Sequence, residues 1–383
     1  MKMLKDKLFG KKVVILDIEE LSFIPHFLPV YRALKSRTDM ISYYIATHYT
    51  GDKSFDEFGI SESKQFPVSM SRSLGNADVF VSAHIYGVGS PASYKIHINH
   101  NQPVKYQSYQ KRDFVNFDAH FLTSPLHREQ TEDTIRNYGL EDMKIDLFDV
   151  GYSKSDALIN GEYDRDKVLN DLGLSPLKKT VLYAPSWDEG LSLRTFGKKI
   201  ISTLLENEET NVIVKLHPIS YCAPDGPNYL FYTGGIDWIN ELSEFESKKN
   251  FRHVPLMNID PMLSAADVMV TDVSSVALEF IILDKPVIYI DCPEFFEKTL
   301  SKVYTGFGET TAELVKNDPK ANAGRHTGIV VEEINELSSV VKRCLSKPEE
   351  FSHKRKELAK KLSYNPGHAG EFAADTIMKI LNI

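Results

Sequence analysis

The stretch from Asp260 to Asp291 constrains the fold of this chain more than any other part of the sequence. It reads DPMLSAADVMVTDVSSVALEFIILDKPVIYID. An apolar run from Val268 to Val270 is followed by a polar turn, by a segment of helical pattern from Val276 to Phe280, and by a second apolar run from Pro286 to Ile290. The order strand, turn, helix, strand is typical of a parallel α/β sheet.

The polar turn of this stretch has the composition of an anion site. Such a turn leaves the first backbone N–H groups of the helix unpaired, at the end where the helix dipole favours negative charge. The hydroxyl groups of Ser274 and Ser275 add two donors there. The turn therefore predicts a site for phosphate or pyrophosphate. The alternative interpretation is that one of these serines simply caps a buried helix.

The whole chain is long enough for two such domains. It has 383 residues, of which 42% are hydrophobic and 26% charged, as in a globular protein with a sizeable core. The net charge of −8 argues against a general nucleic-acid binder, which needs a basic surface. Three widely spaced cysteines, Cys222, Cys292 and Cys344, show no metal-ligand pattern and indicate packing residues in a reducing compartment.

Short apolar runs alternate with helical or polar segments along both halves, which predicts a doubly wound α/β sheet in each. Strands are expected at Val13 to Asp17, Ile41 to Ala46, Asp78 to Ser82, Tyr94 to Ile98, Ala119 to Leu122, Ile145 to Asp149, Thr180 to Ala184, Asn211 to Leu216 and Phe251 to Val254. Helices are expected, among others, at Val30 to Leu34, Leu193 to Leu205, Val331 to Leu345, Lys347 to Leu362 and Ala369 to Ile383.

This pattern divides the chain into an N-terminal domain of residues 1–160, a C-terminal domain of residues 176–365 and a closing helix at 366–383, with a mostly polar linker before the second domain. Within the linker, Asp164 and Asp166 form a D-x-D motif. Acidic residues are favoured at a helix start, so we interpret this motif as a helix N-terminus and predict no metal site. No dinucleotide, Walker or nucleophile-elbow motif is present, and we expect no cofactor.

The chain shows neither a membrane-spanning run of about 18 apolar residues nor a signal-peptide core, so we expect a cytoplasmic protein. Its first twelve residues carry five lysines together with Leu4, Leu8 and Phe9. Such a segment can lie on an anionic membrane surface. The alternative is an exposed, frayed terminus.

Each half also places a histidine just past a predicted strand, His100 in the first and His217 in the second. The carboxyl ends of parallel strands line the ligand crevice, so two domains facing each other would bring both histidines to one cleft. A histidine there can take a proton from an attacking hydroxyl or steady a phosphate oxygen. The alternative is a structural side chain bonded to a loop carbonyl.

Five segments, in order, resemble motifs of the CDP-glycerol glycerophosphotransferase family of teichoic-acid and related surface-polymer synthesis. In the first half, His100 to Lys105 is similar to the family's H-G-x-P-L-K, and Gly151 to Asp156 is similar to G-Y-P-R-x-D. In the second half, Tyr183 to Trp187 is similar to Y-A-P-T-W, and Val214 to Pro218 is similar to V-K-x-H-P. The fifth segment, Asp267 to Phe280, is similar to D-x-x-I-T-D-Y-S-S-x-x-F-D-F. The last motif is the most specific.

The resemblance implies a GT-B fold, with two Rossmann-like domains facing a central cleft. It also implies that a glycerol-phosphate or related polyol-phosphate group passes from a CDP-activated donor to a hydroxyl of a lipid-linked or polymeric glycan acceptor, with release of CMP. In that reaction His100 is the base and His217, also catalytic, holds the donor pyrophosphate with Ser274 and Ser275. Glu279 holds a donor hydroxyl, and the motif residues Lys105, Ser186 and Asp272 complete the donor site.

Departures from the motifs leave the donor head group open. Asn101 replaces the family glycine, Val273 replaces an aromatic residue, and Ser153 and Lys154 replace proline and arginine. A GT-B glycosyltransferase that uses a nucleotide sugar is the first alternative, because the loop with His26 resembles the acceptor loop of such enzymes. A nucleotide-sugar 2-epimerase and a non-catalytic scaffold are the others. A lipid-linked acceptor would place the protein on the inner face of the membrane.

Overall fold

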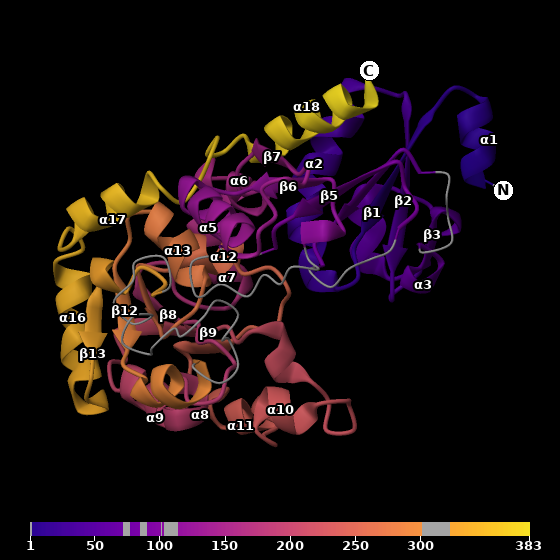
Figure 1. Ribbon diagram of the computed structural model, residues 1–383. Coiled ribbons are helices and arrows are strands. Elements are labelled where there is room, and N and C mark those ends of the chain that lie inside the picture. Colours follow the sequence, from indigo (N-terminus) through magenta and orange to yellow (C-terminus); the bar gives the residue numbers. More distant parts are fainter. Residues whose placement is uncertain (1, 72–76, 85–89, 101, 103–113, 301–321) are drawn as a thin grey trace. The chain divides into compact units, whose positions relative to one another are not determined.

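The chain folds into two compact α/β units. The computed structural model describes residues 2–71, 77–84, 90–100, 102, 114–300 and 322–383 (Figure 1). Unit 1 comprises the described part of residues 1–160 together with Ser363–Ile383, and unit 2 comprises the described part of Gly161–Leu362.

The described residues of unit 1 form a seven-stranded parallel sheet in the order β3-β2-β1-β4-β5-β6-β7. The chain runs outward from β1 to β3, then returns to the other side of β1 and continues from β4 to β7, so the direction reverses between β1 and β4. The strands are β1 (Lys12–Asp17), β2 (Ile41–Thr47), β3 (Gln65–Pro67), β4 (Val79–Ser82), β5 (Tyr94–Ile98), β6 (Ala119–Leu122) and β7 (Asp146–Asp149).

Helices cover the sheet of unit 1 because successive side chains of each strand point to opposite faces. On β1, Val14 and Leu16 pack in one apolar cluster with α2 and α18, whereas Val13 and Ile15 pack in another with Met3 of α1. The helices of this unit are α1 (Lys2–Leu8), α2 (Ile24–Arg37), α3 (Val68–Ser71), α5 (Pro125–Asn137), α6 (Asp156–Ile159) and α18 (Ala369–Leu381).

The last helix of the chain, α18, returns to unit 1 and packs against α2 (Figure 1). Gly370 permits the close approach, because a Cβ atom at this position would lie 2.8 Å from the Cβ of Pro29. The carboxylate of Asp156 accepts hydrogen bonds from the backbone N–H groups of Ala369 (3.0 Å) and Gly370 (2.7 Å), at the start of the helix. The segment Ser363–Ile383 is therefore part of the N-terminal fold.

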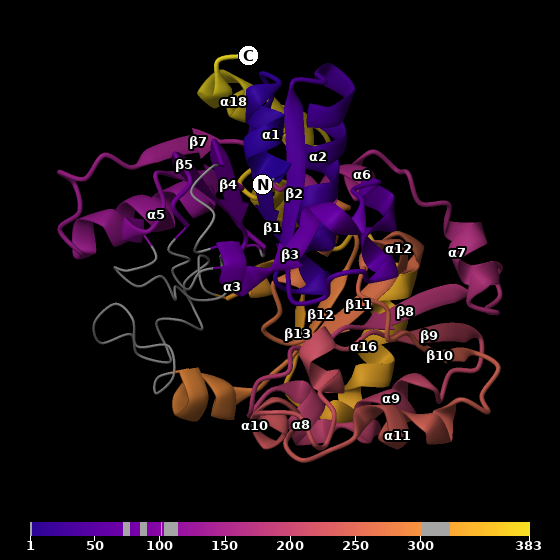
Figure 2. The ribbon, with the colours of Figure 1, turned by 90° about the vertical axis from the view of Figure 1, so that its right-hand side faces the viewer.

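The described residues of unit 2 form a six-stranded parallel sheet in the order β10-β9-β8-β11-β12-β13, which can be followed in Figure 2. Here the direction reverses between β8 and β11. The strands are β8 (Lys179–Tyr183), β9 (Thr210–Val214), β10 (Phe251–His253), β11 (Val268–Thr271), β12 (Val287–Ile290) and β13 (Ile329–Val331). The helices are α7 (Arg165–Asp171), α8 (Ser192–Phe196), α9 (Lys198–Leu204), α10 (Tyr229–Thr233), α11 (Trp238–Leu242), α12 (Asp260–Ala265), α13 (Val276–Ile282), α16 (Leu337–Ser346) and α17 (Ser352–Ala359).

Two parallel sheets confirm the predicted α/β class, but several helix predictions were wrong. Helix α2 begins at Ile24 rather than at Val30, and it contains both Pro29 and the buried His26, so the expected loop is helical. The helix expected from Leu193 to Leu205 is broken into α8 and α9 at Gly197, whose φ of +47° lies outside the helical region.

Two edge strands were missed, and one of them replaced the start of a predicted helix. β3 is only three residues long and contains Pro67. The helix expected from Val331 starts instead at Leu337, because Ile329, Val330 and Val331 pair with β12 as strand β13. The helix expected from Lys347 starts at Ser352, after Phe351 in the left-handed conformation.

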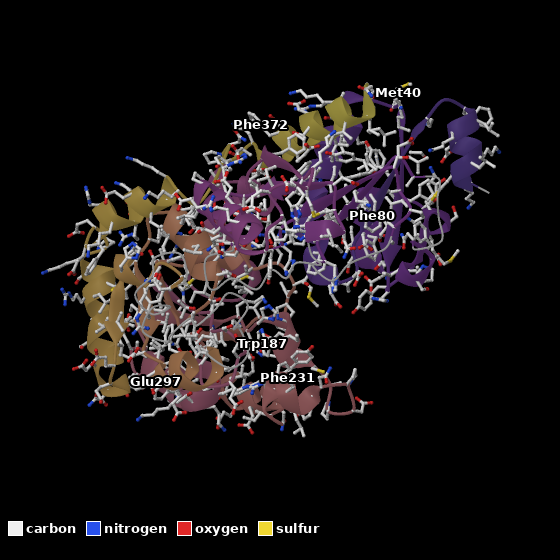
Figure 3. All side chains as sticks on the ribbon, in the orientation of Figure 1. Met40, Phe80, Trp187, Phe231, Glu297 and Phe372 are labelled. Carbon is white, nitrogen blue, oxygen red and sulfur yellow. The ribbon has the colours of Figure 1, made fainter. Side chains whose placement is uncertain are left out.

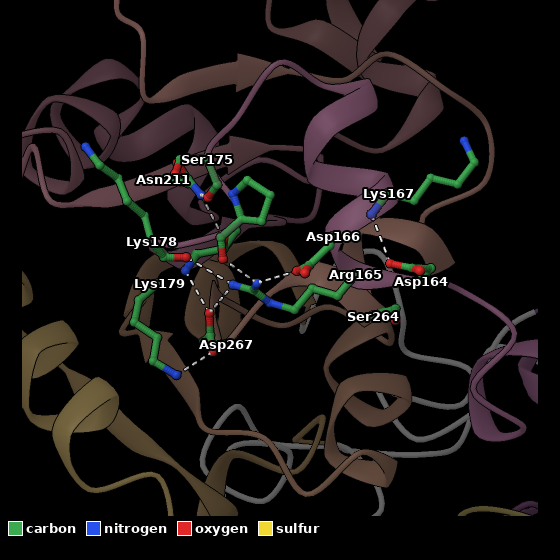
Figure 4. A network of polar contacts seen from close by, with 12 residues as sticks. Asp164, Arg165, Asp166, Lys167, Ser175, Lys178, Lys179, Asn211, Ser264 and Asp267 are labelled. Atoms are coloured by element: carbon green, nitrogen blue, oxygen red, sulfur yellow. Dashed lines mark hydrogen bonds and ion pairs between the residues drawn. The ribbon is translucent and has the colours of Figure 1, made fainter.

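The predicted D-x-D segment begins α7, as Figure 4 shows. The carboxylate of Asp164 caps this helix by accepting from the backbone N–H of Lys167 at 2.9 Å. Arg165 binds Asp166 (3.3 Å) and reaches across to Asp267 (3.3 Å), just before β11. These contacts give both acidic residues structural partners and attach α7 to the sheet of unit 2. Within the described residues, no group of three metal-binding side chains is arranged to hold an ion.

The first helix is docked rather than frayed, which contradicts the second interpretation of the N-terminus. Met3 is buried, and the carboxylate of Asp6 accepts hydrogen bonds from Ser42 (2.5 Å) and Tyr44 (2.6 Å) of β2. In the described part of the chain, no helix combines the length and the apolar character needed to cross a membrane.

Candidate functional site

The predicted donor residues of unit 2 gather at the carboxyl edge of its sheet. Ser186 follows β8, His217 follows β9, and the turn of Ser274 and Ser275 follows β11. Strands β8 and β11 pair in parallel, with Val270 opposite Tyr183, and they flank the point where the strand order reverses. Ligands of open α/β sheets bind outside the carboxyl ends of the strands at such a point.

Asp272 ties the two loops at this edge together. Its carboxylate accepts hydrogen bonds from the backbone N–H of Ser186 (2.9 Å), from the backbone N–H of Ser192 (3.0 Å) and from the Ser192 hydroxyl (2.6 Å). The side chain is buried. These bonds make Asp272 a positioning residue, because they fix the loop after β8 against the turn after β11.

The loop after β8 is held at two further points. The Ser186 hydroxyl donates to Asp188 at 2.9 Å, and both side chains are buried. Trp187, the next residue of the motif, lies beside Phe231 of α10 (Figure 3). Its ring centroid is 5.6 Å from that of Phe231 and 5.4 Å from that of Tyr232. No motif marked Asp188 or Ser192: Asp188 accepts from Ser186 within the same loop, and Ser192 binds Asp272, which is 80 residues away.

Ser274 and Ser275 lie in the turn between β11 and α13. Ser275 occupies the N-cap position of α13, yet its side chain makes no capping hydrogen bond. Both Ser274 and Ser275 are half-buried, and Glu279 is buried one turn further along the helix. Val273, which replaces the family's aromatic residue, packs in the apolar core. The helix-cap alternative for these serines is therefore not realised through the Ser275 hydroxyl.

His217 presents a hydrogen-bond donor at this edge. Its Nδ1 accepts a hydrogen bond from the backbone N–H of Ile219 at 3.3 Å, and the side chain is exposed. A neutral imidazole that accepts at Nδ1 carries its proton on Nε2. The Nε2–H group can therefore donate to an oxygen of an anionic ligand.

His100 has the opposite arrangement in unit 1. Its Nδ1 lies 2.7 Å from the carbonyl oxygen of Ala83, just past β4, and its ring packs on Phe23 with centroids 4.7 Å apart. A carbonyl oxygen can only accept, so Nδ1 carries the proton and Nε2 is the proton acceptor. Burial lowers the pKa of His100 to about 4, and the nearby His84 lowers it as well, whereas the bond to Ala83 opposes this shift. The imidazole is therefore neutral near pH 7.

Not every predicted site residue can be located. Lys105 lies outside the described residues, as does Asn101, which departs from the same motif. Of the others, Ser186, His217, Asp272, Ser274, Ser275 and Glu279 belong to unit 2, and His100 belongs to unit 1. The structure therefore brings the donor-side residues to one edge of one sheet.

Comparison with known proteins bears on this arrangement. Residues 95–295, or 201 of the 383 residues, match the model of the family described as CDP-glycerol:poly(glycerophosphate) glycerophosphotransferase. A teichoic acid poly(glycerol phosphate) polymerase of Staphylococcus epidermidis is 22% identical over 72% of this chain and 35% of its own length. A teichoic acid glycerol-phosphate primase of Bacillus spizizenii is 29% identical over 39% of this chain and 35% of its own length. The chain thus spans about a third of the length of these relatives.

Solved structures support the fold. A structure of the wall teichoic acid polymerase TagF superposes with a TM-score of 0.64 at 17% identity, covering 100% of this chain and 93% of that chain. A Staphylococcus aureus MnaA–UDP structure has a TM-score of 0.57 at 14% identity, with 97% of each chain covered. The predicted GT-B class, with two Rossmann-like units, is confirmed. At these identities the likeness concerns the fold and does not choose between the chemistries of the two proteins.

Proposed function

This chain belongs to the CDP-glycerol:poly(glycerophosphate) glycerophosphotransferase family, and from that premise we propose that it is a transferase. It moves a glycerol-phosphate group from CDP-glycerol to a hydroxyl of a lipid-linked or polymeric glycan acceptor and releases CMP. The curated relatives are named as a polymerase and primases of glycerol phosphate in teichoic acid. Those names support the proposed donor and acceptor.

The observation that carries the proposal is the tautomer of the neutral His100 ring, which has its proton on Nδ1. The neutral ring donates through Nδ1 to Ala83, which leaves Nε2 as the atom that takes a proton from the acceptor hydroxyl. The hydroxyl oxygen then forms a bond to the distal phosphorus of the donor, the bond from that phosphorus to the CMP oxygen breaks, and the proton stays on His100.

Unit 2 supplies the groups for the leaving nucleotide. Phosphoryl transfer depends mainly on positioning and on neutralising charge on the phosphate oxygens. In this proposal the Nε2–H of His217 and the hydroxyls of Ser274 and Ser275 donate to the pyrophosphate, and Glu279 accepts from a donor hydroxyl. Asp272 keeps Ser186 and the serine turn in register through its three hydrogen bonds. Lys105 remains a proposed donor residue from its motif alone.

We further propose that the protein works at the inner face of the membrane, where a lipid-linked acceptor would be found. Helix α1 supports this location. Its lysines are joined by Leu4, Leu8 and Phe9, whose side chains are 51%, 79% and 72% exposed, although the helix itself is docked on unit 1. A docked helix with exposed apolar and basic side chains suits an anionic membrane surface.

The proposal is tested by nucleotide release. Wild-type protein is incubated with CDP-glycerol, CDP-ribitol or nucleotide sugars and with a glycerol-phosphate-terminated acceptor. We expect CMP release from CDP-glycerol, and we expect His100→Asn to slow it roughly 10²- to 10⁴-fold, because asparagine cannot accept the proton. Binding of CDP-glycerol should persist in that variant.

His353→Asn is the matched control, because His353 is 83% exposed on α17 and is not among the residues assigned to the site. It should retain full activity. An unchanged rate in His100→Asn would refute the assignment of the base. Release of UDP from a nucleotide sugar, with no CMP from CDP-glycerol, would favour the glycosyltransferase alternative.

A further inference from the structure

The carboxyl edge of the unit 1 sheet has its own point of reversal, between β1 and β4. The two strands pair in parallel with Asp17 opposite Ser82, the last residue of each. The Ser82 hydroxyl donates to the Asp17 carboxylate at 2.7 Å and also accepts from the backbone N–H of His84 at 3.0 Å. These bonds fix the start of both following loops, so that the residues beyond them are positioned by rigid strands.

Glu19 and His84 meet across this point. Each lies two residues past the end of its strand, and the Nε2 atom of His84 is 3.5 Å from a carboxylate oxygen of Glu19. The same oxygen is 4.0 Å from Nε2 of the more exposed His48. The side chains of Glu19 and His84 are 13% and 29% exposed, so this pair is sheltered yet reachable from solvent. In an open α/β sheet this is the position where a ligand binds.

The pair shares this edge with the proposed base. Ala83, whose carbonyl holds Nδ1 of His100, is the residue immediately before His84, and the His84 side chain interacts electrostatically with His100. Neither Glu19 nor His84 lies in residues 95–295, the segment that matches the family model. The chemistry assigned so far therefore gives these two residues no task.

We propose that Glu19 and His84 form a hydroxyl-binding subsite for the end of the acceptor. A glycerol-phosphate chain ends in a glycerol with two adjacent hydroxyl groups. His100 takes the proton of one, while the carboxylate of Glu19, which can only accept, receives a hydrogen bond from the other. His84 keeps that carboxylate in place. The subsite thus selects acceptors with adjacent hydroxyls and orients the reacting oxygen at His100. This inference rests on the proposed function.

The test compares two soluble acceptors. One ends in glycerol phosphate, and the other ends in 3-hydroxypropyl phosphate, which lacks the second hydroxyl. We expect the wild type to prefer the first in kcat/KM by roughly tenfold to a hundredfold, as for the loss of a hydrogen bond to a charged group. In both Glu19→Gln and His84→Asn this preference should shrink. For Glu19→Gln the two kcat/KM values should differ by no more than about threefold, because a neutral amide is a weaker acceptor than a carboxylate.

Glu357→Gln is the control, because Glu357 forms a similar pair with His353 (3.6 Å) on the exposed face of α17. It should keep the wild-type preference. A wild type that uses both acceptors equally would overturn the subsite whatever the variants do, while the proposed transfer would stand. An undiminished preference in Glu19→Gln would overturn the role of the carboxylate. A wild type that releases no CMP with any acceptor would overturn the proposed function, and this inference with it.

Discussion

Two histidines in similar sequence positions differ in what their ring nitrogens can do. Both follow a β-strand, yet Nδ1 of His100 faces a carbonyl and Nδ1 of His217 faces a backbone N–H. The first contact makes Nε2 an acceptor and the second makes Nε2 a donor. One residue type is thereby suited to two tasks, deprotonating a hydroxyl and binding a phosphate oxygen.

Ser275 allows a phosphate ligand to be distinguished from a helix cap. Its side chain makes no capping bond, so Ser275→Ala should change the free energy of unfolding by less than about 0.5 kcal/mol. The same variant should weaken CDP-glycerol binding roughly tenfold, because a donor to a charged oxygen is lost. Fluorescence reports the stability of unit 2, since both tryptophans, Trp187 and Trp238, belong to it.

Asp164→Ala is the control for Ser275→Ala. Asp164 does cap its helix through the N–H of Lys167, so its loss should cost about 1 kcal/mol and leave donor binding unchanged. A cost of the same size for Ser275→Ala, with unaltered binding of CDP-glycerol, would restore the structural interpretation of the serine turn.

At the scale of secondary-structure elements, unit 1 buries histidines in its sheet and in a neighbouring helix. His97 of β5 lies opposite His120 of β6, with ring centroids 5.3 Å apart, and His127 is buried at the start of α5. Burial lowers the pKa of His120 to about 3. Burial is also the main cause that lowers the pKa of His127 to about 3, and the neighbouring His120 and Arg128 lower it further. These side chains stay neutral in the folded protein.

Unit 1 should therefore lose stability in mild acid. The unfolded chain binds a proton at each histidine as the pH falls through about 6.5, whereas the folded chain does so only below its lowered pKa. At pH 5 each such histidine should cost about 2 kcal/mol relative to pH 8. Hydrogen exchange in β5 and β6, followed between pH 8 and pH 5, measures this slope of the free energy of unfolding against pH. His120→Phe, which keeps an aromatic ring and cannot be protonated, should reduce the slope, and an unaltered slope would contradict the prediction.

At the scale of the whole molecule, the chain ends in the unit in which it begins. Helix α18 packs on α2 through Gly370, and Asp156 binds the backbone at its N-terminus. The terminal residues of the chain are thereby part of unit 1 rather than an appendage of unit 2. The same unit carries α1, so the proposed membrane contact and the proposed base belong to one compact body.

The proposed membrane contact through α1 and Phe9 can be tested on the whole protein with lipid vesicles. We expect it to co-sediment with vesicles that contain anionic lipid, less so at high salt. Replacing Leu8 and Phe9 by serine should weaken this binding by about tenfold or more, because two exposed apolar side chains no longer insert. Leu177→Ser, at a leucine of unit 2 that is 98% exposed, is the control. Equal binding by both variants would exclude α1 as the contact.

Patterns that act over a few residues were readable from the sequence. The apolar runs located most of the strands, and the last helix was predicted from Ala369, where α18 begins. The motifs also located the serine turn and both histidines. Predictions failed where a partner distant in sequence decides the outcome: Val331 pairs with Ile290 as a strand, although its surroundings suggested a helix.

The sequence by itself determined the fold class, the order of the motifs and the residue types of the site, because periodicity and turn chemistry are local. Only the tertiary structure decided what those residues do. Asp272 holds Ser192 from 80 residues away, and Glu19 meets His84 because β1 and β4 lie side by side. Contacts of this kind set the tautomer, the burial and the charge of each site residue. They form only after strands distant in sequence have paired in the sheet.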